Sequence, residues 1–395
     1  MTVVKPLTIG IDATNLRGGG GVTHLVELLR VAQSTLYGIE RVVVWGGTPT
    51  LKVLDNRPWL DKRTPPALDK GLLQRTLWQR YSLSQAARDA GCDVLFVPGG
   101  SYAGNFHPVV TMSRNLLPFE VRELLRYGWS LLTLKLLLLR LVQSRSFRKT
   151  DGVIFLTEYA RDVVLRVTGK LRGQTCIVPH GLNPRFNKAP KLQRAIAEYN
   201  NAHPYRVLYV SIIDQYKHQW HVVEAVAALR KQGFPIVLDL VGPAYPAARK
   251  RLNQTIDRVD AERRWVHYHG AIPFNELHLR YAKADLGLFA SSCENMPNIL
   301  LETMASGLPI ACSNRGPMPE VLGQAGVFFN PEQPEDIARV LRELIESPQT
   351  RTKLARASYE RVQEYSWQRC ADETCRFLVG VVQQRKKKGI CDVKK

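Results

Sequence analysis

At 395 residues the chain is longer than the roughly 100–200 residues of one ordinary domain, so we expect two domains. Hydrophobic residues make up 45% and charged residues 23% of a sequence without repeats or low-complexity tracts, which is typical of a globular protein and excludes a solenoid or propeller. The net charge of +20 favours an anionic partner, such as nucleic acid, a membrane surface or a phosphorylated ligand, and also fits a merely solubilising surface.

The positive charge is unevenly distributed along the chain. Residues 1–200 contain 28 Lys and Arg against 14 Asp and Glu, whereas residues 201–384 contain 21 against 20. The tail, residues 385–395, contains 6 against 1. Attraction to an anionic partner is therefore expected of the N-terminal half and the tail.

The start of the chain and its cysteines both favour a reducing, cytoplasmic setting. Residues 3–7 lack the long apolar run of a signal peptide. The seven cysteines are scattered, odd in number and without CxxC spacing, which argues against a disulfide framework and against a cysteine zinc site.

The first half predicts a doubly wound α/β domain. An apolar strand at 7–11 is followed by Asp12, by four glycines at 18–21 and by a helix from Val22, which is how such a domain begins. Helical stretches separate further apolar runs and predict a parallel sheet, with strands at 41–45, 93–97, 109–112, 152–156 and 175–178.

The same alternation of strand and helix restarts after a polar stretch at 187–203. Strands are expected at 206–211, 236–241, 265–269, 286–289 and 309–312. We therefore expect two Rossmann-like domains over 1–182 and 183–365, a helix over 366–384 that crosses back onto the first domain, and a basic tail over 385–395.

One segment, residues 294–302, joins the strand at 286–289 to a helix that runs through Met304. Pro297 stands where that helix would begin, and a helix N-terminus offers N–H groups and a positive dipole end that suit a diphosphate. Glu302, inside the helix, would accept hydrogen bonds from vicinal hydroxyls such as those of a ribose. Glu294, before the helix, would lie near a sugar attached to the β-phosphate. An ordinary capped helix with acidic residues near its start is the alternative interpretation.

This segment resembles the signature of the large retaining glycosyltransferase family with the GT-B fold, family 4, also called glycosyl transferases group 1. The signature is matched by Glu294 and Glu302, by Pro297-Asn298 between them, and by 303–310 after them. Further stretches that fit the family are 178–181, 209–217, 269–270, 281–285 and 319–321. The resemblance is strong over about 175–380 and weaker, though consistent in plan, over 1–174.

The resemblance implies a fold of two Rossmann-like doubly wound domains facing across a cleft, with the acceptor on the first and the nucleotide sugar on the second. It further implies that Glu302 holds the ribose, that Glu294 contacts hydroxyls of the donor sugar, and that Lys217 faces the departing β-phosphate. The residues whose backbone would approach the diphosphate are Asn298, Ile299, Leu300, Gly20 and Gly21, and the stretch that would face the base is Gly270, Ala271 and Ile272.

Two positions depart from the family pattern. The family usually has an arginine five residues before the lysine, and this chain has Ile212 there, so Lys217 acts with fewer partners or another basic residue takes over. The family often has His-Asp after the strand at 109–112, where this chain has Ser113 and Arg114. Both residues are expected on the acceptor side, where Arg114 suits an anionic acceptor; a surface arginine without a role fits equally well.

The resemblance implies transfer with retention of anomeric configuration, from a nucleotide-diphosphate sugar to a glycan, lipid-linked or lipopolysaccharide-type acceptor. UDP is favoured over GDP as the nucleotide. The sequence has no Asp-x-Asp motif of the kind that carries a divalent ion in the other main glycosyltransferase fold, so no metal and no other cofactor is expected.

Residues 120–148 predict one long amphipathic helix. Arg122, Arg126, Ser130, Thr133, Arg140, Ser144 and Arg148 recur on one side, and leucines occupy the other. Its uncharged stretches are shorter than the ~20 residues that span a bilayer, so the helix either lies on an anionic membrane, aided by the basic tail, or packs its leucines on the first sheet. The first alternative predicts a peripheral protein on the inner face of the membrane.

Three other functions remain open at this point. A nucleotide-sugar epimerase or a phosphorylase shares the fold, and a catalytically inactive scaffold fits the departure at Ile212. A nucleic-acid-binding protein would fit the charge of +20, but the chain has no recognisable RNA- or DNA-binding motif, so no nucleic-acid partner is expected.

Overall fold

The structure, a computed structural model, describes residues 6–392 and divides into two compact units. The first unit contains the chain up to Phe119, residues Leu134–Gly181 and the chain from Ser366 onward; the second contains Glu120–Thr133 and Leu182–Tyr365. Residues 1–5, on which the expected lack of a signal peptide rests, and residues 393–395 of the basic tail lie outside the described part.

The first unit is built on a parallel sheet with the order β3-β2-β1-β4-β5-β6-β7. Its strands are β1 (Leu7–Asp12), β2 (Ile39–Trp45), β3 (Leu60–Arg63), β4 (Val94–Val97), β5 (Val109–Met112), β6 (Gly152–Phe155) and β7 (Gln174–Ile177). The predicted strands are all present, and β3 is an additional one. Every residue of β3 is half-buried, so this edge strand lacks the apolar run from which the others were predicted.

The second unit contains a parallel sheet with the order β10-β9-β8-β11-β12-β13. Its strands are β8 (Tyr205–Val210), β9 (Ile236–Val241), β10 (Val266–Tyr268), β11 (Leu286–Phe289), β12 (Ile310–Ser313) and β13 (Val327–Phe329). The five predicted strands are present, and the short edge strand β13 is additional. In both units the strand order reverses beside the first strand, which is the doubly wound arrangement expected from the sequence.

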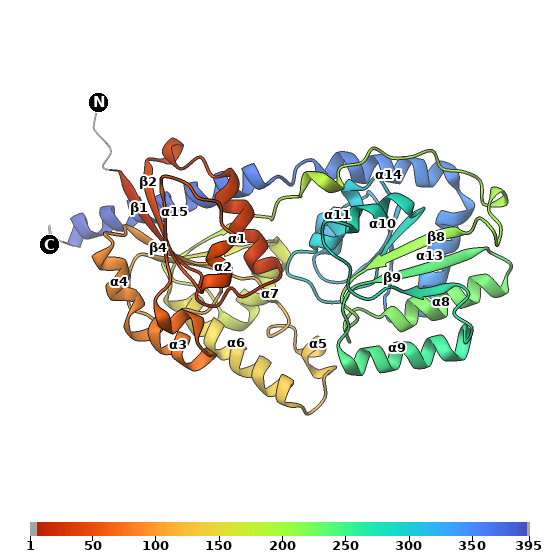
Figure 1. Cartoon of the computed structure of the whole chain (residues 1–395), viewed down its shortest axis with the longest axis horizontal. Helices are drawn as coiled ribbons and strands as arrows, with labels where there is room; N and C mark the ends of the chain where they lie inside the picture. Colours follow the sequence, from red (N-terminus) through yellow and green to blue (C-terminus); the bar gives the residue numbers. More distant parts are fainter. Residues whose placement is uncertain (1–5, 393–395) are drawn as a thin grey trace. The chain divides into compact units, whose positions relative to one another are not determined.

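Helices lie on both faces of each sheet (Figure 1). Those of the first unit are α1 (Gly20–Val31), α2 (Thr48–Lys52), α3 (Leu72–Tyr81), α4 (Leu83–Asp89), α7 (Glu158–Thr168) and α15 (Trp367–Asp392), with the short 3-10 helices η1 (Ser34–Tyr37) and η2 (Pro66–Asp69). Those of the second unit are α5 (Val121–Leu125), α8 (Gln219–Lys231), α9 (Pro246–Val259), α10 (Leu277–Lys283), α11 (Asn298–Ala305), α12 (Met318–Leu322), α13 (Pro334–Glu346) and α14 (Pro348–Val362), with η3 (Pro184–Phe186) and η4 (Ile196–Glu198). Helix α6 (Leu131–Lys149) begins in the second unit and continues in the first.

The C-terminal helix α15 belongs to the first unit, so the predicted crossover is confirmed. It packs against α1, where the rings of Trp367 and His24 lie 5.8 Å apart between centroids. The helix is longer than the expected 366–384 and continues through the described part of the tail. Arg385 forms an ion pair with Asp151 at 3.0 Å, which gives this part of the tail a contact on the first unit.

The long helix expected over 120–148 is two helices, α5 and α6. Gly128 lies between them with φ +61°, a left-handed conformation that glycine adopts readily and that interrupts a helix. This region also shifts the expected domain boundary, because residues 120–133 belong to the second unit, although the sequence placed them in the first domain. The reason is a set of side-chain contacts with distant residues of the second unit, described below.

Helix α6 buries the face that the sequence would leave to solvent. Thr133, Gln143, Ser144 and Ser146 are buried, and the Ser146 hydroxyl accepts a hydrogen bond of 2.9 Å from the Tyr102 N–H. Four leucines point outward instead: Leu131, Leu134, Leu138 and Leu141 are 87%, 65%, 60% and 69% exposed, whereas Leu136 is buried. The interpretation in which the leucines pack on the first sheet therefore fails for these four exposed leucines, since the first unit offers hydrogen-bonding groups to polar residues of this helix.

Candidate functional site

The candidate site of the second unit lies where two neighbouring strands end. Strands β8 and β11 are paired at the point where the strand order of the sheet reverses. Ligands of doubly wound domains bind outside the carboxyl ends of the strands at such a point. The loop after β8 carries Lys217, and the loop after β11 carries Glu294, which explains why residues 77 positions apart meet.

Lys217 and Glu294 form an ion pair between Nζ and Oε1. The two side chains are largely buried, with 7% and 17% exposed. The ammonium group also lies 5.0 Å from the ring centre of Tyr216 and 5.5 Å from that of Phe289, distances at which a ring attracts a cation. The structure thus places the predicted cation against the predicted sugar-binding carboxylate, in a setting with little water to screen them.

Backbone hydrogen bonds hold the two loops together. The Ser292 N–H donates to the Tyr216 carbonyl at 2.8 Å, which joins the loop after β11 to the loop after β8. The hydroxyl of buried Tyr209, on β8, donates to the Lys217 carbonyl at 2.9 Å. These bonds position Lys217 through its main chain and leave its side chain to the ion pair.

The predicted diphosphate cradle at the start of α11 is only partly available. The Asn298 N–H donates to the Met296 carbonyl at 3.0 Å and the Leu300 N–H to the Pro297 carbonyl at 2.9 Å. This helix has neither a side-chain cap nor an acidic residue in its first turn, so its dipole end is not neutralised locally.

Glu302 lies inside α11 and is buried, with 8% of its surface exposed. Burial raises the pKa of its carboxyl to about 8, against a weaker lowering by the Tyr281 hydroxyl. That hydroxyl donates to Oε2 at 3.5 Å, a long hydrogen bond that leaves much of the carboxylate's capacity unused. A neighbouring ligand with two hydroxyl donors would satisfy this group better than the protein does by itself.

Gly270 and Ala271, expected to face the base, come shortly after β10, with His269 between. Gly270 has φ +68°, so the turn requires glycine there, and its carbonyl accepts a hydrogen bond of 2.8 Å from the Gly242 N–H. Ala271 is exposed. The turn is thus fixed to the end of β9, and the residue after it is accessible to a ligand.

Residues 120–133 contribute side chains to this site that the sequence did not indicate. Glu123 accepts a hydrogen bond of 2.6 Å from the Ser292 hydroxyl, and the Tyr127 hydroxyl donates to Asp214 at 2.7 Å. Arg126 pairs with Glu123 at 2.7 Å and with Glu332 at 2.6 Å. The segment therefore braces both loops of the site. Its partners are 87 to 206 residues away in the sequence, so no local pattern reveals them.

The first unit has its own cluster of predicted residues around Arg114. Gly20 and Gly21 are the first residues of α1, and the preceding turn is made by Gly19, which has a φ of +60°. Gly21 lies close to Arg114: a Cβ atom built on Gly21 would be 3.0 Å from the Arg114 guanidinium. Desolvation lowers the pKa of Arg114 to about 10, and its Nε is buried without a hydrogen-bond partner. Ser113, in contrast, is 1% exposed and lies in the core behind this surface.

Comparison with protein families and known proteins bears on the second unit above all. Residues 194–361 match the sequence model of the family described as Glycosyl transferases group 1. The match includes Lys217, Glu294 and Glu302, so the resemblance predicted from the sequence is confirmed over the unit that carries them.

Curated proteins with sequences similar to this chain are named as transferases or synthases. Sulfoquinovosyl transferase SQD2 of Arabidopsis thaliana is 31% identical over 25% of this chain and 21% of its own length. An α-(1→4)-mannosyltransferase of Mycolicibacterium hassiacum is 30% identical over 39% of this chain and 38% of its own, and a glycogen synthase of Mycobacterium tuberculosis is 24% identical over 60% and 56%. The chain thus covers only part of the length of each of these relatives.

Solved structures share the fold of nearly the whole chain. Sucrose-phosphate synthase of Thermosynechococcus elongatus superposes with a TM-score of 0.72 at 18% identity, covering 94% of this chain and 98% of its own. HepE of Anabaena, solved with UDP and glucose, superposes with a TM-score of 0.70 at 17% identity, covering 95% and 100%. The chain therefore has the GT-B fold, as predicted.

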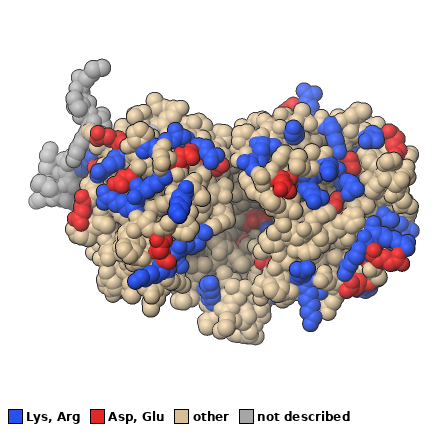
Figure 2. Space-filling view, in the orientation of Figure 1, with Lys and Arg blue, Asp and Glu red and all other residues tan. Residues whose placement is uncertain are grey.

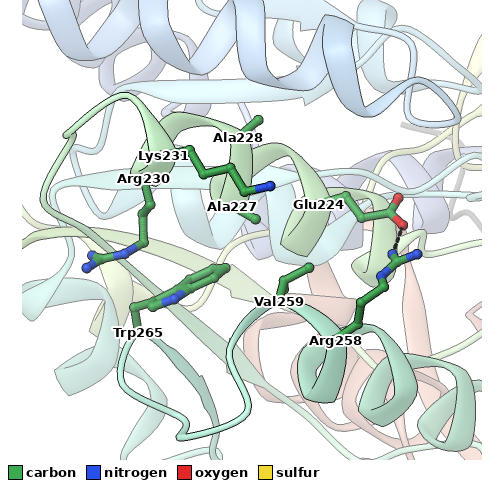
Figure 3. A pocket seen from close by; sticks show the side chains of 8 residues that line it. All are labelled: Glu224, Ala227, Ala228, Arg230, Lys231, Arg258, Val259 and Trp265. Carbon is green, nitrogen blue, oxygen red and sulfur yellow. Dashed lines mark hydrogen bonds and ion pairs between the residues drawn. The ribbon is translucent and has the colours of Figure 1, made fainter.

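A pocket of about 620 Å³ elsewhere in the second unit is not part of the predicted site (Figure 3). It lies between α8 and α9 and ends at Trp265, before β10. Across it Glu224 and Arg258 are joined by an ion pair, and the Arg230 guanidinium lies 5.6 Å from the ring centre of Trp265. Three of the charged residues that line this pocket are thus engaged with one another or with an aromatic ring.

Proposed function

We propose that this chain is a glycosyltransferase that moves a hexosyl-type sugar from a nucleotide-diphosphate donor to an acceptor. The observation that carries the proposal is the Lys217–Glu294 pair at the reversal point of the second sheet, beside the N-terminus of α11. This arrangement supplies a cation, helix N–H groups and a carboxylate that a phosphate-linked sugar requires. The match of residues 194–361 to the model of the glycosyl transferases group 1 family supports it.

In the proposed reaction the acceptor hydroxyl bonds to the anomeric carbon while the bond from that carbon to the β-phosphate oxygen breaks. The products are a glycoside and a nucleoside diphosphate. The departing phosphate gains negative charge, which Lys217 and the N-terminus of α11 neutralise; preorganised donors of this kind contribute ~3–4 kcal/mol each where measured in other enzymes. Attack from the leaving-group face retains the configuration and lets a phosphate oxygen take the proton, without a metal or a side-chain base.

Glu294 has two roles in this scheme. Before the donor binds it neutralises Lys217, which would otherwise be a nearly buried unpaired cation. When the donor binds, the phosphate takes over Lys217, and Glu294 becomes free to accept hydrogen bonds from the sugar hydroxyls. Glu302 accepts hydrogen bonds from the ribose, and the turn at Gly270 and Ala271 faces the base.

Arg315 is proposed to replace the arginine that the family has at the position of Ile212. Arg315 is followed by Gly316, which lies close to Glu294: a Cβ atom built on Gly316 would be 3.8 Å from the Glu294 backbone nitrogen. The loop that carries Arg315 therefore borders the site. The Arg315 Nε is buried without a hydrogen-bond partner, and Glu332 is 4.0 Å from the guanidinium. A cation with spare donors at this loop can share the charge of the leaving phosphate with Lys217.

The acceptor is proposed to be an anionic glycan or glycolipid recognised by Arg114. This guanidinium is largely desolvated and lies against the glycine turn that begins α1, so an anion there would gain both charge neutralisation and helix N–H groups. Polysaccharide or lipopolysaccharide-type acceptors carry such groups.

A peripheral contact with an anionic membrane is also proposed, through the exposed leucines of α6. Apolar side chains on this helix alternate with Lys135 and Arg145, which are exposed as well, and this pattern is typical of a helix lying in a membrane interface. The protruding end of α6 nearest α5 is mostly uncharged in Figure 2. Among the described residues, no helix is long and apolar enough to cross a bilayer.

UDP is proposed as the nucleotide in preference to GDP. Structures of similar fold have been solved with UDP and with UDP-glucose, although another relative is named as dependent on GDP-mannose. The function is tested by a thermal-shift screen of UDP, GDP and ADP sugars, since a ligand that binds only the folded chain raises the melting temperature by mass action. Stabilising donors are then assayed for sugar transfer; a chain that binds no nucleotide sugar, or that converts one without an acceptor as an epimerase does, contradicts the proposal.

A further inference from the structure

A second convergence of polar side chains lies at the edge of the sheet in the second unit. Asp239 of β9 and His267 of β10 are paired directly opposite each other in the parallel register. His269 comes two residues after His267, and side chains two apart on a strand point to the same face. The strand register therefore brings a carboxylate and two imidazoles together.

The potential ligand atoms are close enough to hold one ion. Asp239 Oδ1 lies 2.6 Å from His269 Nε2 and 3.6 Å from His267 Nδ1, and one such atom from each residue lies within 4.8 Å of the other two. Ligands at the bond lengths of tetrahedral zinc, about 2.0–2.1 Å, are roughly 3.3 Å apart. We propose that Asp239, His267 and His269 form a binding site for a divalent transition-metal ion, with Zn²⁺ the expected ion.

The donor set determines this choice of ion. Two imidazole nitrogens and one carboxylate oxygen suit Zn²⁺ and its first-row neighbours, whereas Ca²⁺ and Mg²⁺ prefer oxygen ligands throughout. Arg206 holds the other carboxylate oxygen of Asp239 at 3.1 Å, which leaves Oδ1 as the ligand atom. The side chains of His267 and His269 are 37% and 23% exposed, so an ion can reach them and water can complete its coordination.

The ion would fasten the edge strand to the rest of the sheet. β10 is the last strand of its sheet and pairs only with β9 among the described strands. A metal bound by Asp239 and His267 ties the two strands by their side chains, and its bond to His269 holds the residue that precedes the Gly270 turn. The expected consequence is greater stability of this edge. The inference does not depend on sugar transfer, because none of the three residues has a role in the proposed reaction.

A simpler interpretation is that the histidines only hydrogen-bond to Asp239. The experiment that distinguishes metal binding from hydrogen bonding alone uses the full chain, from which metal is removed with a chelator followed by dialysis. Zn²⁺ is titrated by calorimetry and the melting temperature is measured with and without it; we expect one equivalent to bind and the melting temperature to rise. Co²⁺ in place of Zn²⁺ should give a visible spectrum without the thiolate charge-transfer band that cysteine ligation would produce.

Two variants and a control complete the test. His267→Ala and His269→Gln should each weaken Zn²⁺ binding about tenfold or more. Changing residues that only hydrogen-bond to a metal ligand already lowers metal affinity by that much in other proteins, so losing a ligand should lower it at least as far. His203→Ala removes an exposed histidine outside the cluster and should bind Zn²⁺ as the unaltered chain does. His267 is partly exposed on an edge strand, so its replacement should not prevent folding; circular dichroism checks this. Absence of stoichiometric binding, binding that survives in both variants, or a thiolate band overturns the inference.

Discussion

Lys217 and Glu294 form an ion pair across the reversal point of the second sheet, although 77 residues separate them in the chain. The contact follows from the pairing of β8 with β11, because each residue lies in the loop that leaves the carboxyl end of one of these strands. A pair that is more than four-fifths buried holds both charges in a defined place before any ligand arrives. The site is thus preorganised by sheet topology.

Removal of the ammonium group should abolish most of the transfer activity. Lys217→Ala is expected to lower kcat about 10²–10³-fold, the loss seen when one preorganised donor is removed from other active sites. The turnover number with a nucleotide-sugar donor measures this effect. Lys191→Ala is the matched control, since Lys191 forms an exposed ion pair with Asp285 at 3.0 Å in the same unit. Equal activity in the two variants would remove Lys217 from the mechanism.

Glu302 should make stability depend on pH in an unusual direction. Its pKa is about 8 in the folded chain and near 4.5 when exposed, so between these values the folded chain keeps a proton that the unfolded chain has lost. The free energy of unfolding should therefore fall as the pH rises from about 4.5 to 8 and level off above 8. Glu302→Gln should abolish this contribution, which urea unfolding of both proteins at several pH values would reveal as a difference in slope.

The same residue should couple nucleotide binding to proton release. Ribose hydroxyls that donate to Glu302 favour its charged form, so affinity for UDP should increase toward the pKa of about 8 and binding should release a proton. Calorimetry in buffers of different ionisation enthalpy measures the released proton. Glu302→Gln should bind UDP more weakly and without proton release; an unchanged affinity would assign the ribose to another group.

Arg114 should be required for anion binding but not for stability. Its guanidinium is desolvated beside a glycine turn, so Arg114→Met should leave the melting temperature unchanged or higher in the absence of anions. Inorganic phosphate should raise the melting temperature of the unaltered chain and not that of the variant. Arg88→Met, which removes an exposed arginine of α4, serves as the control. A phosphate effect that persists in Arg114→Met would refute this role.

Arg315 and Ile212 should be interchangeable in part. Arg315→Ala is expected to reduce kcat, since it removes the proposed second cation at the leaving phosphate. Ile212 is 38% exposed, so Ile212→Arg can be accommodated, and it should restore part of the activity of Arg315→Ala by returning the arginine of the family pattern. Turnover of the single and double variants measures the compensation. Full activity in Arg315→Ala would leave Lys217 as the cation of the site.

The exposed leucines of α6 should bind anionic vesicles. Replacing Leu134, Leu138 and Leu141 with Asp is expected to reduce co-sedimentation with vesicles that contain anionic lipid, while folding is preserved because these side chains are exposed. Leu192→Asp alters a leucine that is 88% exposed in the second unit and should have no effect. Binding that is equal for all variants, or that is absent in the unaltered chain, would contradict a membrane contact through these leucines.

The sequence by itself determined the alternation of strands and helices, the parallel sheets and the segment from Glu294 to Glu302. Buried parallel strands are continuous apolar runs, and a helix start with acidic residues at fixed spacing is a local pattern, so each can be recognised without knowing what lies nearby. The half-buried strand β3 escaped prediction because it lacks such a run, and β13 escaped because three apolar residues are too few to indicate a strand.

Only the tertiary structure decided which side of α6 is buried and which unit holds residues 120–133. Both depend on partners far away in the chain: Tyr102 satisfies Ser146, and Asp214, Ser292 and Glu332 bind the segment before α6. The raised pKa of Glu302 and the ion pair of Lys217 have the same origin. Burial and long-range charge pairing arise from the packing of whole elements, and a local pattern of residue types contains no information about them.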